Sequence, residues 1–235
     1  MVRLLSVIAV LCFGWVSTAH AEFSSGCRMG EVVKFSVKGW VNKSGEGQMS
    51  IGQDGSPFAY TSRDSEGNTK TRTLNPWSFS ATPETWDGIN TSLGEPVVVC
   101  YSQAQFNSGI YQDTDYTVTS VTPIAPDTPK PDLSACTIPK PDTSWHNGGT
   151  RVGRIVKASN KGTFIKSYEV IVQEGNAGNN YFEMSISDEK IFNCAMMALK
   201  SGRKLKISYV EYVWSLGRDT NYDIYGLTLA GSLPE

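Results

Sequence analysis

The sequence contains few of the residues and motifs that support metal, nucleophilic or nucleotide chemistry. Histidine occurs only twice, at His20 and His146. There is no C-x-x-C pair, so a four-cysteine zinc site lacks its usual ligand spacing. There is also no G-x-S-x-G, H-E-x-x-H or P-loop pattern. These absences exclude the common sequence signatures of metallohydrolases, serine hydrolases and phosphate-binding enzymes.

Net charge and long apolar runs are scarce as well. Lysine and arginine together number 21 and aspartate and glutamate 23, for a net charge of −2. A near-neutral chain lacks the general signature of polyanion-binding proteins. Hydrophobic residues make up 40% of the 235 positions, which argues against intrinsic disorder. After residue 16, no apolar run is long enough to span a membrane.

The first 21 residues have the pattern of a secretory signal peptide. Arg3 precedes an apolar stretch of about 13 residues, and an A-x-A box ends at Ala21. A membrane anchor is the alternative, but a spanning helix needs roughly 20 apolar residues. We expect cleavage near Ala21 and a periplasmic, or fully secreted, mature protein.

Cleavage would remove one of the five cysteines and leave four, at Cys27, Cys100, Cys136 and Cys194. An even number of cysteines in an exported chain predicts two disulfide bonds. Four cysteines allow three pairings, so the sequence by itself does not choose among them.

Two segments of the chain resemble each other at a constant offset of 123 positions. Nine of seventeen positions are identical between residues 30–46 and 153–169. The ends correspond too, because residues 113–116 read Asp-Thr-Asp-Tyr and residues 219–222 read Asp-Thr-Asn-Tyr. The unit occurs only twice, which predicts a domain duplication and not a solenoid.

The expected domains are residues 22–123 and 151–235, joined by a proline-rich linker at 124–150. The first carries an insertion at about 52–73, whose polar composition is typical of a hairpin or surface loop. Six of the 11 prolines lie between Pro123 and Pro141, which predicts an extended, stiff spacer. A strap packed on one domain is the alternative, and a bridge from Cys136 to Cys194 would favour it.

Each unit has the pattern of three strands, a helix and two strands. The expected strands before the helix are 32–37, 40–51 and 77–81 in the first unit, and 154–158, 163–172 and 181–186 in the second. Helices are expected after Thr82, with Pro83 at the first position, and after Ser187 as N-cap. Gly94 and Gly202 end them.

A five-strand order with a helix between the third and fourth strands is the topology of the OB-fold. The predicted fold class is therefore mainly β, with two tandem OB-like five-stranded barrels. Another small β-barrel or an open α+β sheet is the alternative. In an OB barrel the first strand lies beside the fourth, so a Cys27–Cys100 bridge fits the topology. Cys136 would then pair with Cys194 on the second helix and tie the linker to that domain.

The second unit carries two further motifs. Residues 151–169 read RVGRIVKASNKGTFIKSYE, and residues 218–222 read RDTNY. They resemble a family of small, uncharacterised bacterial proteins with an RxGxxxKxSxKGxxxKTxEG-like first hairpin and an RGDTxY-like closing strand. This chain departs from that pattern at Ser167, at Val170 and in the order of Gly217 and Arg218.

Some members of that family carry a dehydrogenase label. The label finds no support in this chain, because no glycine-rich dinucleotide motif follows a predicted strand. The family has no settled activity, so the resemblance implies no substrate.

The small net charge conceals a division between the two units. Residues 22–123 hold 7 basic and 11 acidic residues, a charge of −4, and residues 151–228 hold 11 basic and 8 acidic, a charge of +3. OB barrels bind ligands across strands two and three, where the second unit has a basic hairpin. The candidate binding residues are Arg154, Lys157, Lys161, Phe164, Lys166 and Tyr168, together with Trp40. The alternative is that these lysines keep a sheet edge soluble or attract the acidic unit.

We predict no catalytic residue, no metal site and no cofactor, and we expect His146 to be a structural or solvated loop residue. The leading hypothesis is an exported, non-enzymatic binding or scaffolding protein of the bacterial envelope. Its partner would be another envelope protein, in a periplasmic assembly such as a secretion or conjugation system. The alternatives are a glycan- or oligonucleotide-binding module that uses the basic hairpin, and a hydrolase with a non-standard site.

Overall fold

The structure is a computed structural model. It describes residues 22–39, 43–52, 59–63, 69–73, 76–105, 112–142, 147–162, 166–175, 180–214 and 217–231, with the backbone alone at 59–63 and 69–73. The expected signal peptide lies outside the described residues, as do Trp40, His146 and Phe164.

The described chain forms twelve strands and two helices. The first group of elements is β1 (Glu22–Lys38), β2 (Ser44–Ile51), β3 (Ala59–Arg63), β4 (Thr69–Thr73), β5 (Pro76–Ala81), α1 (Pro83–Thr91), β6 (Pro96–Ala104) and β7 (Tyr116–Pro123). The second group is β8 (Asn147–Lys161), β9 (Ser167–Glu174), β10 (Tyr181–Ile186), α2 (Glu189–Ser201), β11 (Leu205–Glu211) and β12 (Tyr222–Leu229). Neither described helix has the length and apolarity needed to cross a membrane.

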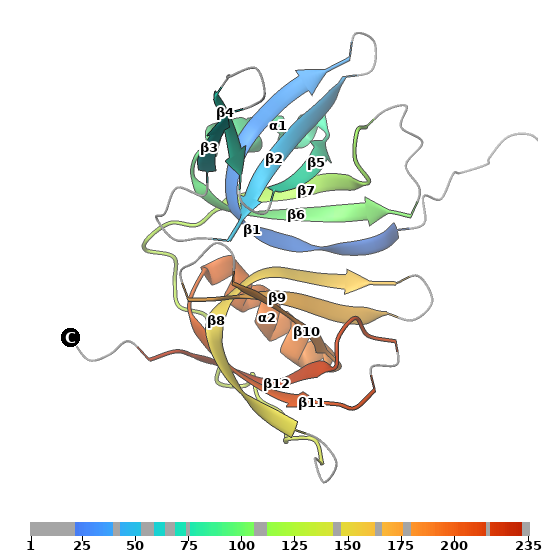
Figure 1. The fold of residues 1–235 in the computed structure, drawn as a ribbon, viewed down its shortest axis with the longest axis vertical. Coiled ribbons are helices and arrows are strands. Elements are labelled where there is room, and N and C mark those ends of the chain that lie inside the picture. Colours follow the sequence, from blue (N-terminus) through green and yellow to red (C-terminus); the bar gives the residue numbers. More distant parts are fainter. Residues whose placement is uncertain are drawn as a thin grey trace, which may run out of the picture.

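Ten of the strands close into two five-stranded rings, as Figure 1 shows. The first ring runs β1-β2-β5-β7-β6 and returns to β1, and the second runs β8-β9-β10-β12-β11 and returns to β8. A helix lies between the third and fourth strands of each ring, so the architecture is mainly β with the expected OB-like strand order. We call the rings barrel 1 and barrel 2.

The first strand of each barrel is longer than expected. β1 and β8 begin at Glu22 and Asn147, before the predicted 32–37 and 154–158. Each carries a bulge, after Val32 and after Ile155, and bulges bend a strand. The first half of each strand pairs with the fourth strand of its barrel, and the second half pairs with the second strand. One bent strand thereby closes each barrel.

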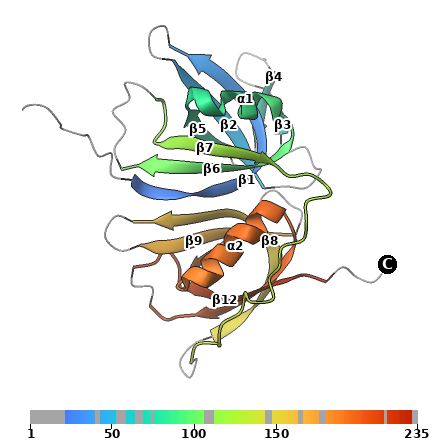
Figure 2. The same ribbon diagram turned by 180° about the vertical axis from the view of Figure 1, so that it is seen from behind.

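The two barrels are joined through these long strands. Residues 24–28 of β1 pair antiparallel with residues 157–161 of β8, which unites both rings in one ten-stranded sheet. Figure 2 shows the barrels stacked, with β1 lying against the strands of barrel 2. Gly26 lies at the centre of this junction, and a Cβ atom there would be 2.3 Å from the carbonyl oxygen of Ala158. The backbones approach closely because position 26 has no side chain.

Each barrel is filled by apolar side chains that alternate along its strands, and a helix covers it. The amphipathic helix α2 buries Ile191, Cys194 and Leu199 and ends at Gly202, whose φ of 63° is left-handed. Its N-cap is Asp188 and not the predicted Ser187. The Asp188 carboxylate accepts from the amide of Ile191 at 3.1 Å. Ser187 instead donates its hydroxyl hydrogen to Asp223, across the sheet on β12.

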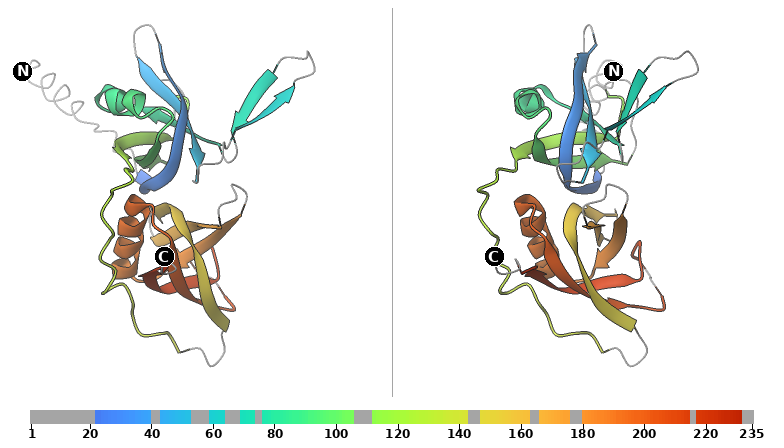
Figure 3. Two further views of the ribbon diagram at one scale, coloured as in Figure 1. Left: turned by 90° about the vertical axis from the view of Figure 1, so that its left-hand side faces the viewer. Right: turned by 60° about the vertical axis from the view of Figure 1, so that its left-hand side comes forward.

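The second half of the proline-rich segment packs on barrel 2 as a strap, which was the alternative to an extended spacer. Leu133 and Cys136 are buried, and a disulfide joins Cys136 to Cys194. The amide of Leu227 donates to the carbonyl of Cys136 at 2.8 Å, which ties the strap to β12. Figure 3 shows the segment running down the outside of barrel 2.

The second disulfide joins Cys27 to Cys100, which lie directly opposite each other on β1 and β6. Both disulfides are the pairs that the expected topology favoured. Within the predicted insertion, β3 and β4 form a separate two-stranded sheet, and Figure 3 shows this hairpin projecting from barrel 1.

Candidate functional site

The outer face of the first three strands has the same layout in both barrels. Cross-strand register arranges its side chains in two rows. The inner row is Ser36, Glu46 and Ser80 in barrel 1, and Ser159, Glu169 and Ser185 in barrel 2. The outer row is Lys34, Gln48 and Ser78 in barrel 1, and Lys157, Ile171 and Glu183 in barrel 2. The inner rows are therefore identical in residue type, and the outer rows differ.

The glutamate of the inner row anchors the loop that precedes the last strand of each barrel. Glu169 is buried and accepts hydrogen bonds from the hydroxyl of Ser185 at 2.7 Å and the amide of Asp219 at 3.1 Å. The Asp219 carboxylate accepts from the ammonium of Lys161 at 2.8 Å, and the hydroxyls of Ser185 and Thr220 lie 3.1 Å apart. We call these five residues the loop anchor.

Barrel 1 contains the equivalent anchor. The hydroxyl of Ser80 and the amide of Asp113 donate to Glu46 at 2.8 and 3.2 Å, and Asp113 pairs with Lys38. Thr114 takes the place of Thr220. In barrel 2, Lys161, Glu169, Asp219 and Thr220 are also motif positions in the sequence resemblance described above. In the structure, residues at those positions anchor the loop that precedes β12.

Glu169→Ala is expected to destabilise the protein by about 2–3 kcal/mol, because it removes the buried carboxylate that accepts from the Ser185 hydroxyl and the Asp219 amide. Urea denaturation measures this loss. Glu183→Ala removes an exposed glutamate one strand away and should change stability by less than about 0.5 kcal/mol. Equal losses in the two variants would contradict the anchoring role.

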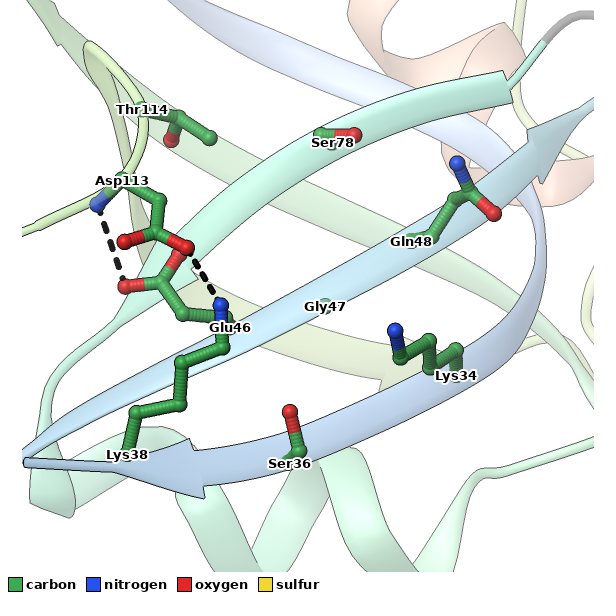
Figure 4. Close-up of a pocket in the computed structure, with 9 residues that line it drawn as sticks. All are labelled: Lys34, Ser36, Lys38, Glu46, Gly47, Gln48, Ser78, Asp113 and Thr114. Carbon is green, nitrogen blue, oxygen red and sulfur yellow. Dashed lines mark hydrogen bonds and ion pairs between the residues drawn. The ribbon is translucent and has the colours of Figure 1, made fainter.

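The face of barrel 1 is open. It forms a pocket of about 290 Å3 lined by Lys34, Ser36, Lys38, Glu46, Gly47, Gln48, Ser78, Asp113 and Thr114. In Figure 4, the side chains of β1 and β2 stand on one side of the sheet, and Lys38 reaches toward Asp113. Lys34 and Ser78 are exposed. These lining residues offer both hydrogen-bond donors and acceptors, and none of them is aromatic.

The matching face of barrel 2 is partly covered by barrel 1. Residues 24–28 of β1 lie along β8, so Ser159 is only 1% exposed. Lys157 is half-buried and directly opposite Arg28. The hydroxyl of Tyr181 donates to the carbonyl of Ile51 at 2.8 Å, which adds a second contact between the barrels. Barrel 1 thus partly covers the face of barrel 2 that corresponds to its own open face.

The structure does not bring the predicted hairpin residues onto one surface. The Arg154 side chain donates through Nε to the carbonyl of Gly202 at 3.0 Å, at the C-terminus of α2. Tyr168 stacks on Phe192 of the same helix, with ring centroids 4.3 Å apart. Tyr168 is adjacent in β9 to Glu169 of the inner row, so the two point to opposite sides of the sheet.

The predicted lysines lie elsewhere on barrel 2. Lys157 and Lys161 belong to the partly covered face, and Lys161 is paired with Asp219. Lys166 lines a small pocket of about 130 Å3 at the β1–β8 junction, together with Asn160. The described residues of the basic hairpin therefore lie in separate environments, and whether any of them bind a ligand stays a prediction.

Two arginines that the sequence analysis did not single out lie among aromatic rings. The Cζ atom of Arg28 is 4.5, 5.3 and 5.2 Å from the ring centroids of Trp77, Tyr101 and Tyr116. Arg28 is opposite the buried Val99 in the β1–β6 ladder. Attraction between a cation and aromatic faces stabilises this arrangement.

The equivalent arginine of barrel 2 is Arg151, 3.5 Å from the ring centroid of Phe182. The repeat offset of 123 relates it to Arg28, two positions before the first matched segment. Extending the matched segments by two positions toward the N-terminus would have paired Arg28 with Arg151 in the sequence.

Comparison with known proteins does not assign this chain to a family. No family model matches the chain, and no curated protein matches it either. Among solved structures, the single-stranded DNA binding protein from Thermus aquaticus is 10% identical, with 91% of this chain and 96% of that chain covered and a TM-score of 0.23. A deletion mutant of that protein is 11% identical, with 91% and 98% covered and a TM-score of 0.23. Similarity at this level does not bear on the ligand of this chain.

The described residues also contain no group of three or more His, Cys, Asp or Glu side chains placed to hold a metal ion.

Proposed function

We propose that this protein is an exported, non-enzymatic binding protein of the bacterial envelope, and that the open face of barrel 1 receives its partner. One observation carries the proposal. The two faces share the same inner row, and the face of barrel 1 forms a pocket of about 290 Å3, whereas the matching face of barrel 2 is partly covered by β1. The structural part of the face is thus present in both barrels, and an accessible pocket is described on barrel 1.

We also infer that the barrels are two copies of one module. The support is the shared ring order, the shared loop anchor and the arginine among aromatic rings in each barrel. After a duplication, one copy can hold the assembly together while the other keeps its surface for binding. The differing outer rows, Lys-Gln-Ser and Lys-Ile-Glu, are consistent with this division.

The chemistry of the open face suits another protein better than a nucleic acid. Single-stranded nucleic acids bind in basic grooves that carry aromatic stacking platforms. The pocket lining has no aromatic ring among its residues, and residues 22–123 carry a charge of −4. Lysine, glutamine and serine side chains pair well with the polar groups of a protein surface. Two disulfides are typical of proteins in an oxidising compartment, where the partner would be an envelope protein.

Site-specific photo-crosslinking tests this function. A photoreactive residue at Ser78, which is exposed on the open face, should give a discrete protein adduct in envelopes of the source cells. Lys34→Glu should reduce the adduct about tenfold, because it reverses a charge beside the contact. The matched control is the same photoreactive residue at Lys206, exposed on β11 of barrel 2, which should give no such adduct.

Equal adducts from positions 78 and 206, or an adduct at 78 that Lys34→Glu leaves unchanged, would overturn the proposal. An adduct at 78 with oligonucleotide or glycan in place of protein would overturn the protein partner and favour the alternative ligands.

A further inference from the structure

Two buried hydrogen-bond donors near the β1–β8 junction have no acceptor. Arg28 is only 9% exposed, and its Nε atom has no hydrogen-bond partner among the described residues. The same is true of Nε1 of the buried Trp77, whose ring centroid is 4.5 Å from the Arg28 guanidinium carbon. Buried donors in folded proteins nearly always have partners, so each exception needs an explanation.

A third donor lies beside them. Lys157 is directly opposite Arg28 in the β1–β8 register, and no described residue accepts a hydrogen bond from its ammonium group. Antiparallel register places opposite side chains on the same side of the sheet, about 5 Å apart at Cβ. Two cations at such positions repel each other, so their pairing is unfavourable unless an anion lies nearby.

The equivalent arginine of barrel 2 shows what Arg28 lacks. Arg151 donates through Nη1 to a carboxylate oxygen of Glu174 at 2.6 Å, although its Nε atom, like that of Arg28, has no hydrogen-bond partner among the described residues. At the repeat offset, the position of Glu174 corresponds to Ile51, which has no charge. Arg28 therefore keeps its aromatic neighbours but has no carboxylate at the position that serves Arg151.

The charged groups around Lys157 leave an excess of positive charge. They are Arg28 on β1, Lys161 on β8, Glu183 on β10 and Asp219 before β12. Lys161 is paired with Asp219 and also faces Glu169, so Glu183 is the remaining carboxylate near Lys157 and Arg28. Burial lowers the pKa of Lys157, and Arg28 and Lys161 lower it further.

We propose that the β1–β8 junction binds an oxyanion, a phosphate or carboxylate group, which accepts hydrogen bonds from Arg28, Trp77 and Lys157. Such a group supplies acceptors for the unpartnered donors and balances the charge. Hydrogen bonds between ionised partners are the strong ones, and arginine is well suited to planar oxyanions. The site is separate from the open face of barrel 1, so it stands or falls independently of the proposed partner.

The indole N–H resonance of Trp77 reports on this site directly, and Trp77→Phe assigns it among the five tryptophans of residues 22–235. Titration of the full mature chain with inorganic phosphate, and separately with acetate, at constant ionic strength should shift this resonance saturably. Saturation with phosphate alone or with acetate alone identifies which oxyanion the site takes.

Lys157→Gln should weaken the binding about tenfold or more, because it removes a charged donor. Lys157→Arg keeps the positive charge and should retain the shift. Lys206→Gln is the matched control, since Lys206 is exposed on β11 and far in register from the junction. The absence of a saturable shift with either anion, or equal affinities in wild type and Lys157→Gln, would overturn the proposal.

Discussion

Replacing Gly26 with valine is expected to separate the two barrels at the β1–β8 junction while each barrel stays folded. A Cβ atom at position 26 would lie 2.3 Å from the carbonyl oxygen of Ala158 and 2.6 Å from Cα of Ser159. Both atoms are backbone, so rotation of a side chain does not relieve the overlap. The three nearest atoms all belong to β8, so the added side chain pushes on barrel 2 and not on β6.

Hydrogen exchange measures this separation. Overpacking costs about 1–3 kcal/mol or more, and each 1.4 kcal/mol is a factor of ten, so amides at 157–161 that bond to β1 should exchange about tenfold faster. The matched control is Gly231→Val, because a Cβ atom at position 231 meets no atom within 4 Å. Unchanged protection at 157–161 in Gly26→Val would show that the junction tolerates a side chain.

Removing the Cys136–Cys194 disulfide by a double alanine substitution is expected to lower the free energy of unfolding by about 4 kcal/mol. The bridge closes a loop of 58 residues, and an open loop gives the unfolded chain more conformational freedom. The strap would then be held by backbone hydrogen bonds, such as that from the amide of Leu227 to residue 136, and by burial of Leu133.

Urea denaturation of the double variant measures the loss, and proteolysis in the strap reports its release. The matched control is the alanine pair at Cys27 and Cys100, which join strands already paired along β1 and β6. That pair should also lose stability but should leave the strap protected. A change of less than about 1 kcal/mol on removing Cys136–Cys194 would contradict the predicted contribution, whose usual range begins near 2.

Local patterns predicted most of the elements. The predicted strand 181–186 has the observed ends of β10, and Pro83 and Gly202 lie at helix ends as predicted, whereas α1 ends at Thr91, before the predicted Gly94. The N-cap of α2 was misplaced because Asp188 and Ser187 are both good caps, and only the fold brings Asp223 beside Ser187. Local sequence does not contain that contact.

The early parts of β1 and β8 were missed for a related reason. Residues 22–30 include Ser24, Ser25 and Gly26, which have little preference for a strand. They become extended because they pair with β6 on one edge and β8 on the other. Such pairing depends on residues far away in the chain, and periodicity carries no signal of it.

The spatial arrangement of the predicted binding residues was harder to derive from the sequence than the fold. The basic residues of the second unit were treated as one surface, although strand alternation separates Tyr168 from the neighbouring Glu169. Counting alternate positions would have placed Lys157, Ser159 and Lys161 together and set Tyr168 apart. The partners of Arg28 could not have been found in this way, because its rings come from β5, β6 and β7.

The double pairing of β1 also has a consequence for assembly of the two barrels during synthesis. Residues 24–28 of β1 pair with β8, which is synthesised roughly 130 residues later. Until β8 is available, the edge of β1 that faces it stays unpaired. A β8 strand from a second chain offers the same register as the chain's own. The chain's own β8 and a β8 from a second chain compete for residues 24–28, and the outcome depends on the effective concentration of each. Tethering through residues 124–146 raises the effective concentration of the chain's own strand, which therefore wins in dilute solution. Exchange of strands between chains, if it occurs at high concentration, would use this junction.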